Sequence, residues 1–171
     1  MAAAVTLRLD FLHIFCYNYI SKIKGEFYMR LWHKELIEAL PKQQLVAQWR
    51  ELSAIASNIK TKGYPNHILV DKIVGYSFNH FISYASYVRT EMTKRGYKTM
   101  DRVWQNIISV ANGDYNILPK EELFPNWHNH RYLAQCYYNL EEKYDCGGIS
   151  QEDFYKIVDV MERENWIGED I

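Results

Sequence analysis

The stretch Leu40-Pro-Lys-Gln-Gln-Leu-Val-Ala-Gln-Trp-Arg-Glu-Leu52 carries the clearest structural signal in the chain. Pro41 suits the first turn of an α-helix, where its missing N–H group would have no partner. Leu45, Trp49 and Leu52 then follow at intervals of four and three residues, which place them on one side of a helix. The stretch therefore predicts an amphipathic helix that begins near Pro41 and buries this apolar face.

Helical patterns continue along the rest of the chain. A short apolar element is expected at 67–74 and a loop at 118–127. Ser150 is a natural N-cap, and Asp153 is placed to complete a capping box with it. The remaining helices are predicted at 79–94, 100–111, 129–143 and 151–165. Because no repeat and no convincing pair of strands is found, the sequence predicts an all-α fold, a single compact helical domain.

Size and composition describe an ordinary globular protein. The chain has 171 residues, of which 48% are hydrophobic and 24% charged, enough for one domain with its own core. No uninterrupted apolar run is long enough to span a membrane. Cys16, Cys136 and Cys146 are odd in number and irregularly spaced, which indicates reduced thiols rather than a disulfide framework. We expect a cytoplasmic monomer that does not associate with membranes.

Charge is distributed unevenly along the chain. Residues 29–139 contain 14 Lys and Arg against 9 Asp and Glu, a net charge of +5. Residues 140–171 contain 3 against 10, a net charge of −7. A basic body permits a polyanionic partner, although charge of this size is also common on solvated surfaces. The C-terminal part is an acidic helical tail.

Residues 1–28 differ in character from the rest of the chain. Asp10 and His13 interrupt the apolar stretch, which argues against a secretory signal. One interpretation is an extra helix packed on the domain. The other, which we favour, is a translated leader, because the codons for Lys24-Gly-Glu26 can spell a purine-rich ribosome-binding sequence shortly before the Met29 codon.

Several motifs after this point resemble one enzyme family. Met29-Arg-Leu-Trp32, followed by the helix at 40–52 with its Arg-Glu-Leu ending, resembles the pyrimidine dimer DNA glycosylases. Further likeness appears at Thr93-Lys-Arg-Gly-Tyr97, Gly113-Asp-Tyr115 and Leu140-Glu-Glu-Lys143. The resemblance thus runs in order over about residues 29–143, and it implies a glycosylase-like helical domain over 29–171.

The resemblance implies a bifunctional glycosylase and abasic-site lyase acting on damaged duplex DNA. In that family the α-amine of the mature chain attacks the sugar C1′ atom and forms a Schiff base. The nucleophile is usually a threonine exposed by removal of the initiator methionine. Arg30 is too large to expect that removal here, so Met29 would use its own amine, and Glu51 would be the acid/base carboxylate. The DNA-binding residues that the resemblance implies are Arg30, Arg50, Gln43 and Gln44.

Elementary chemistry agrees with these roles. An α-amine has a reference pKa of about 8, against about 10.4 for lysine, so it is the better nucleophile near neutral pH. A carboxylate beside the sugar stabilises developing positive charge and transfers protons. Gln44, Gln48 and Glu51 recur at spacings of four and three, so one helix presents all three on a polar face. Arg50 beside Glu51 is expected to hold the carboxylate ionised and to grip a phosphate.

Other residue types receive less specific predictions. Phosphate contacts are expected, on charge alone, from Lys34, Lys42, Arg89, Lys94 and Arg95. Tryptophans and tyrosines at helical spacing, Tyr84 among them, are expected to pack in the core rather than stack on bases. His128 and His130, with His67 or His80, form a weak metal signal. We expect no metal and no cofactor.

Two functions from different classes stay open on the sequence alone. The first is the DNA repair enzyme, a hydrolase and lyase, which the adjacent Arg50 and Glu51 favour. The second is a catalytically inactive DNA-binding or protein-interaction domain on the same scaffold, which the acidic tail and the missing threonine favour.

Overall fold

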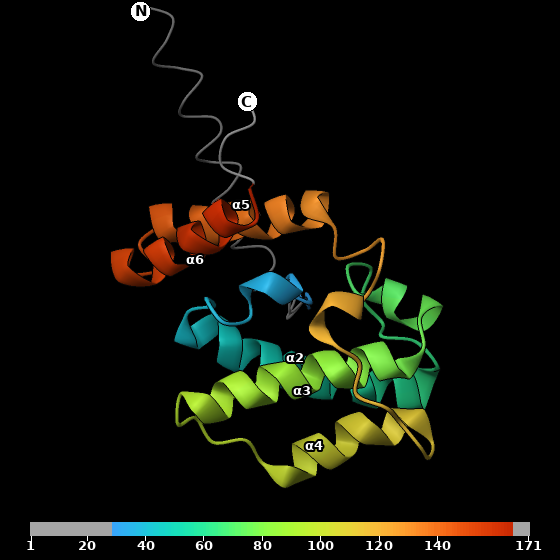
Figure 1. Cartoon of the computed structure of the whole chain (residues 1–171). Coiled ribbons are helices and arrows are strands. Elements are labelled where there is room, and N and C mark those ends of the chain that lie inside the picture. The colour runs from blue at the N-terminus through green and yellow to red at the C-terminus, as the bar shows by residue number, and fades with distance from the viewer. Residues whose placement is uncertain (1–28, 166–171) are drawn as a thin grey trace, which may run out of the picture.

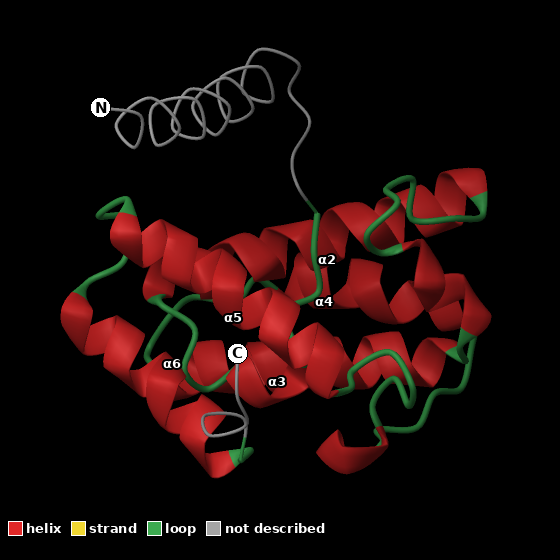
Figure 2. Cartoon of the chain, turned by 90° about the horizontal axis from the view of Figure 1, so that it is seen from above, coloured by secondary structure: helices red, strands yellow, loops and turns green. Residues whose placement is uncertain are grey.

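The computed structural model describes residues 29–165, so the predicted leader at 1–28 lies outside the described residues. Within 29–165 the chain is helical and contains no strand, as Figure 2 shows, and the all-α prediction is confirmed. The α-helices are α2 (Lys42–Lys62), α3 (Phe78–Lys94), α4 (Asp101–Ile108), α5 (His130–Asp145) and α6 (Gln151–Arg163). None of the helices in this range combines the length and the apolar character needed to cross a bilayer.

The helices form two layers with the opening segment between them. Helices α2, α3 and α4 make up one layer, and α5 and α6 pack together as the other (Figure 1). The segment 29–40, blue in Figure 1, passes between the layers and includes the 3-10 helix η1 (Lys34–Leu36), which contacts α6. Buried side chains from the segment and from both layers belong to one apolar cluster. The opening residues of the described chain therefore lie in its interior.

Helix α2 is the long helix that the opening stretch predicts. Leu45, Trp49 and Leu52 are buried, as their spacing requires. The helix begins at Lys42, directly after Pro41. It ends at Lys62 and is capped by Gly63, whose left-handed backbone (φ 82°) suits glycine and lets its N–H group donate to the Ile59 carbonyl oxygen at 2.8 Å.

Local capping sets the other helix boundaries. Ser77 Oγ accepts the Asn79 N–H group at the start of α3. Ser150 Oγ accepts the Asp153 N–H group at 3.2 Å, so the N-cap prediction for α6 is confirmed. The carboxylate of Asp153 is paired with Lys156 at 3.1 Å instead of completing the capping box.

Two predicted segments have a different form in the structure. The apolar element expected at 67–74 is an irregular loop that leads into the 3-10 helix η2 (Asp71–Gly75), because only part of its apolar side chains reach the core: Val70 and Ile73 are buried, whereas Ile68 and Val74 are exposed. The helix expected at 100–111 is α4, continued by the 3-10 helix η3 (Ser109–Ala111). The 118–127 loop contains a short 3-10 helix, η4 (Lys120–Glu122).

Candidate active site

Hydrogen bonds from both layers hold the segment 29–34 in place. The Trp32 N–H group donates to Gln48 Oε1 of α2 at 2.9 Å. From the other layer, Tyr132 Oη of α5 donates to the Leu31 carbonyl oxygen at 2.5 Å. These bonds satisfy main-chain groups that would otherwise be buried without partners. The segment is consequently fixed on both sides, and its main chain lies against the middle of α2.

The Glu51 carboxylate lies beside this main chain. Its Oε2 atom accepts a hydrogen bond from the backbone N–H group of Arg30 at 3.4 Å. The backbone nitrogens of consecutive residues are less than about 4 Å apart, so the Met29 nitrogen lies within roughly 7 Å of this oxygen. The structure therefore brings together Met29 and Glu51, which lie in different elements of the chain.

The environment of Glu51 favours proton exchange near neutral pH. Burial raises the pKa of Glu51 to about 7, against the opposing effects of the Arg30 N–H group and of the positive charges on Arg30 and Lys143. A carboxyl group with a pKa near the working pH is populated in both protonation states, which is what a general acid/base requires. Arg30 and Lys143, rather than the predicted Arg50, are the cations that lower the pKa of this carboxyl.

Gln48 and Tyr84 form a buried polar network next to Glu51. Gln48 is fully buried, and its Nε2 atom lies 3.4 Å from Glu51 Oε2. Tyr84 of α3 is fully buried as well, with its hydroxyl 3.0 Å from Gln48 Oε1 and 2.8 Å from the Trp32 carbonyl oxygen. The expected polar face of α2 is therefore an interior face, covered by the segment 29–34. Tyr84 packs in the core as predicted, but it also has this polar role.

Arg30 is bound within the protein through its side chain. Its guanidinium donates to Asn139 Oδ1 of α5 at 3.1 Å and lies over the Trp32 ring at 5.3 Å from the centroid. The guanidinium thus ties the opening segment to α5, in addition to any contact it makes with DNA. The sequence patterns do not point to Asn139, which belongs to the other layer.

The other residues assigned to DNA binding lie on or near the outer side of α2. Arg50 and Gln43 are exposed and are separated by seven residues, so they share one face of the helix. Gln44 is half-buried, and its Oε1 atom is buried with no hydrogen-bond partner among residues 29–165. The face of Arg50 and Gln43 is separate from the interior face that carries Gln48, whereas Gln44, four residues before Gln48, belongs to the interior face.

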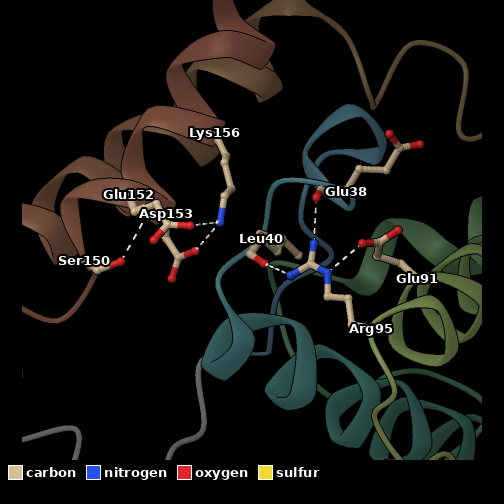
Figure 3. A network of polar contacts seen from close by, with 8 residues as sticks. All are labelled: Glu38, Leu40, Glu91, Arg95, Ser150, Glu152, Asp153 and Lys156. Carbon is tan, nitrogen blue, oxygen red and sulfur yellow. Dashed lines mark hydrogen bonds and ion pairs between the residues drawn. The ribbon is translucent and has the colours of Figure 1, made fainter.

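Arg95, one of the predicted phosphate contacts, is a structural residue. Its Nε atom donates to the buried Glu91 carboxylate, and its two terminal nitrogens donate to the carbonyl oxygens of Leu40 and Glu38, each at 2.6 Å (Figure 3). Arg95 therefore fastens the turn before α2 to the end of α3 through three of its five N–H groups. Its contact with DNA stays a prediction from charge alone.

Two more predicted contacts are engaged within the protein. Lys34 Nζ donates to the Glu121 carbonyl oxygen at 2.6 Å. Arg89 pairs with Asp101 at 2.7 Å and lies over the Trp104 ring. The remaining two basic residues of that set are exposed: Lys42 and Lys94.

The histidines of the weak metal signal serve a different purpose. His128 stacks on His33, with ring centroids 5.1 Å apart, and its Nδ1 atom accepts the Lys34 N–H group at 3.0 Å. Burial lowers the pKa of His33 to about 4 and that of His128 well below its usual value. The neutral pair thus helps to anchor the opening segment. Across residues 29–165, no three His, Cys, Asp or Glu side chains are grouped so as to hold a metal ion.

The candidate site thus consists of the half-buried Glu51 carboxylate, which lies against the main chain of the opening segment. The family model for pyrimidine dimer DNA glycosylase matches residues 29–105, a partial segment of the chain. Residues 29–105 are therefore similar to that family, which confirms the resemblance over this range. Neither the curated proteins nor the solved structures gave a significant match. The likeness at 113–143 stays a prediction.

Proposed function

We propose that the chain from Met29 onward is a DNA repair glycosylase with abasic-site lyase activity on damaged pyrimidines in duplex DNA. The single observation that carries this proposal is the 3.4 Å contact between the Arg30 main-chain nitrogen and Glu51, a carboxyl whose pKa is raised to about 7. When Met29 is the first residue, its α-amine is the nitrogen next to that contact. The family match of residues 29–105 supplies the substrate class.

In the proposed reaction the neutral Met29 amine attacks C1′ of the damaged nucleotide. The glycosidic bond breaks, the base leaves with a proton, and the amine nitrogen loses its protons as the sugar ring opens to the imine. Glu51 accepts and returns these protons. Removal of a C2′ proton then breaks the C3′–O bond by β-elimination and cuts the strand. Hydrolysis of the imine regenerates the amine.

The proposed DNA contacts lie on α2 and beside the Met29 nitrogen. Arg50 and Gln43, on the exposed face of α2, are suited to bind backbone phosphates and sugars. Arg30 is half-buried beside the reacting nitrogen, and Gln44 has an acceptor with no partner among the described residues. We assign these four residues to binding and Met29 and Glu51 to catalysis.

Borohydride trapping tests the proposal. The chain that begins at Met29 is incubated with duplex DNA containing an abasic site or a pyrimidine dimer, and the imine is reduced to a stable amine. We expect a covalent adduct that maps to the Met29 nitrogen. Selective acetylation of the α-amine should abolish the adduct, because an amide nitrogen does not form an imine.

The matched control is the same chain carrying residues 1–28, whose Met29 nitrogen is part of a peptide bond. A folded Met29 chain that binds damaged duplex DNA without any adduct would exclude the lyase and favour the inactive DNA-binding domain on this scaffold.

A further inference from the structure

The buried amide of Gln48 has a defined orientation. Its Oε1 atom faces the Trp32 N–H group at 2.9 Å and the Tyr84 hydroxyl at 3.0 Å. Turning the amide over would point its NH₂ group at the Trp32 N–H group, leaving that buried N–H group without an acceptor. Because Gln48 is fully buried, no solvent compensates for that arrangement. Oε1 is therefore the oxygen, and the donor Nε2 points toward Glu51.

The same orientation distinguishes the two oxygens of Glu51. Oε2 accepts from both the Gln48 Nε2 donor and the Arg30 N–H group, each at 3.4 Å. Among residues 29–165, no protein group donates a hydrogen bond to Glu51 Oε1, and the Glu51 side chain is partly exposed. One carboxylate oxygen is thus held by the protein, and the other is available.

We propose that Gln48, oriented by Trp32 and Tyr84, is the positioning residue that fixes Oε2 of Glu51 and leaves Oε1 to exchange protons with the DNA substrate. This inference rests on the proposed function. Gln48 does not touch the substrate; it acts through Glu51. By donating to Oε2 it stabilises the ionised carboxylate, and so it opposes the effect of burial on Glu51.

The groups that face Glu51 come from three elements. Arg30 of the opening segment and Lys143 of α5 carry positive charge, and Tyr84 of α3 is a neutral phenol held far from ionisation by burial. Of these, Arg30 and Lys143 lower the pKa of Glu51 through their charge, whether or not Gln48 is present. Replacing Gln48 therefore isolates the contribution of its amide donor.

Direct titration of the Glu51 side-chain carbonyl carbon by NMR, in the full chain without DNA, tests the inference. Gln48→Met keeps the approximate volume but removes the donor, so the titration midpoint of Glu51 should rise by about one pH unit. Tyr84→Phe removes one of the two groups that orient the amide, and a smaller rise is expected. Gln105→Met, on the exposed side of α4, should leave the midpoint unchanged.

A folded Gln48→Met chain with an unshifted Glu51 midpoint would overturn the assignment. If Gln48→Met does not fold, Tyr84→Phe decides: an unshifted midpoint in that variant overturns the assignment equally. The titration needs no catalysis, so a folded chain beginning at Met29 that forms no borohydride adduct rejects the proposed function, whereas the titration alone judges the role of Gln48.

Discussion

The two layers of the molecule contribute to the site in different ways. Helix α2 supplies Glu51 and Gln48, which accept hydrogen bonds from the backbone N–H groups of Arg30 and Trp32. Helix α5 supplies Tyr132 and Asn139, which bind the carbonyl oxygen of Leu31 and the guanidinium of Arg30. The family match covers α2 and α3 and ends within α4, before α5 begins. Both layers thus bind the opening segment, but only the layer of α2 also contributes the carboxyl with the raised pKa.

The largest expected effect tests the layer of α2. Glu51→Gln keeps the shape of the side chain but cannot transfer the same protons, so cleavage of an abasic-site duplex should fall at least about 100-fold. Gel assays of strand cutting measure the loss. The matched control is Glu152→Gln on the exposed start of α6, which should cut at the wild-type rate. Equal rates for Glu51→Gln and wild type would remove Glu51 from the mechanism.

The same variant should gain stability where it loses activity. Because the folded-state pKa of Glu51 is about 7 and lies above its ordinary value of 4.5, the ionised form is disfavoured by folding. The penalty is fully present above pH 7 and disappears below pH 4.5. At pH 8 the free energy of unfolding of Glu51→Gln should therefore exceed that of the wild type by roughly 2–3 kcal/mol, measured by urea unfolding. This gain should disappear toward pH 4.5. A destabilised variant at pH 8 would contradict this account.

The histidine pair that joins the opening segment to the loop before α5 should make the fold sensitive to acid. The folded-state pKa of His33 is about 4, below its ordinary value of 6.5. Between these pH values the unfolded chain binds more protons, so stability is complete above pH 6.5 and falls as the pH drops toward 4, by roughly 3 kcal/mol from this residue. Urea unfolding at intervals across this range measures the slope.

His33→Asn should flatten that slope, since asparagine keeps an acceptor for the Glu35 N–H group but does not titrate. Gln105→Asn, at an exposed position of α4, serves as the control and should retain the wild-type slope. An unchanged slope in His33→Asn would show that other groups dominate the acid response.

A smaller effect tests the layer of α5. Tyr132→Phe removes the hydroxyl that donates to the Leu31 carbonyl oxygen at 2.5 Å, so stability should fall by about 1–2 kcal/mol. Because its opening segment is held less firmly, the variant should also cut DNA more slowly, with the pH dependence of the cleavage rate unchanged. Tyr64→Phe, on an exposed loop, should match wild type in both assays. A shifted pH profile in Tyr132→Phe would mean that α5 shares in the proton chemistry.

The smallest effect is expected far from the site. Ser150→Ala removes the N-cap of α6 and should lower the free energy of unfolding by about 1 kcal/mol. The cleavage rate at saturating DNA should not change, because α6 supplies none of the groups that contact Glu51. Thermal melts and single-turnover assays separate the two readouts. A slower rate in a fully folded variant would extend the site to α6.

The sequence predicts the helices well because their signals are local. The spacing of Leu45, Trp49 and Leu52, and the Ser150 cap, each depend on residues within two turns of one another. Gln48 carries a further signal of this kind: it occurs between Leu45 and Leu52 on the buried side of α2, where a glutamine requires buried partners.

The partners themselves were not predictable from such patterns. Tyr84, Tyr132 and Asn139 meet the segment 29–34 across 52, 101 and 109 residues of chain. No helical periodicity encodes contacts at that separation. The bonds of Arg95 to carbonyl oxygens were likewise not predictable, because charge alone cannot distinguish a solvated cation from one bound within the protein.

The interior position of the opening segment has a consequence for biosynthesis. Leu31 emerges from the ribosome early, yet its hydrogen-bond donor is made 101 residues later. Closing so long a loop is slow and occurs only after α5 is complete. A chain interrupted before α5 would lack Tyr132 and Asn139, so its opening segment would have only the partners that α2 and α3 supply.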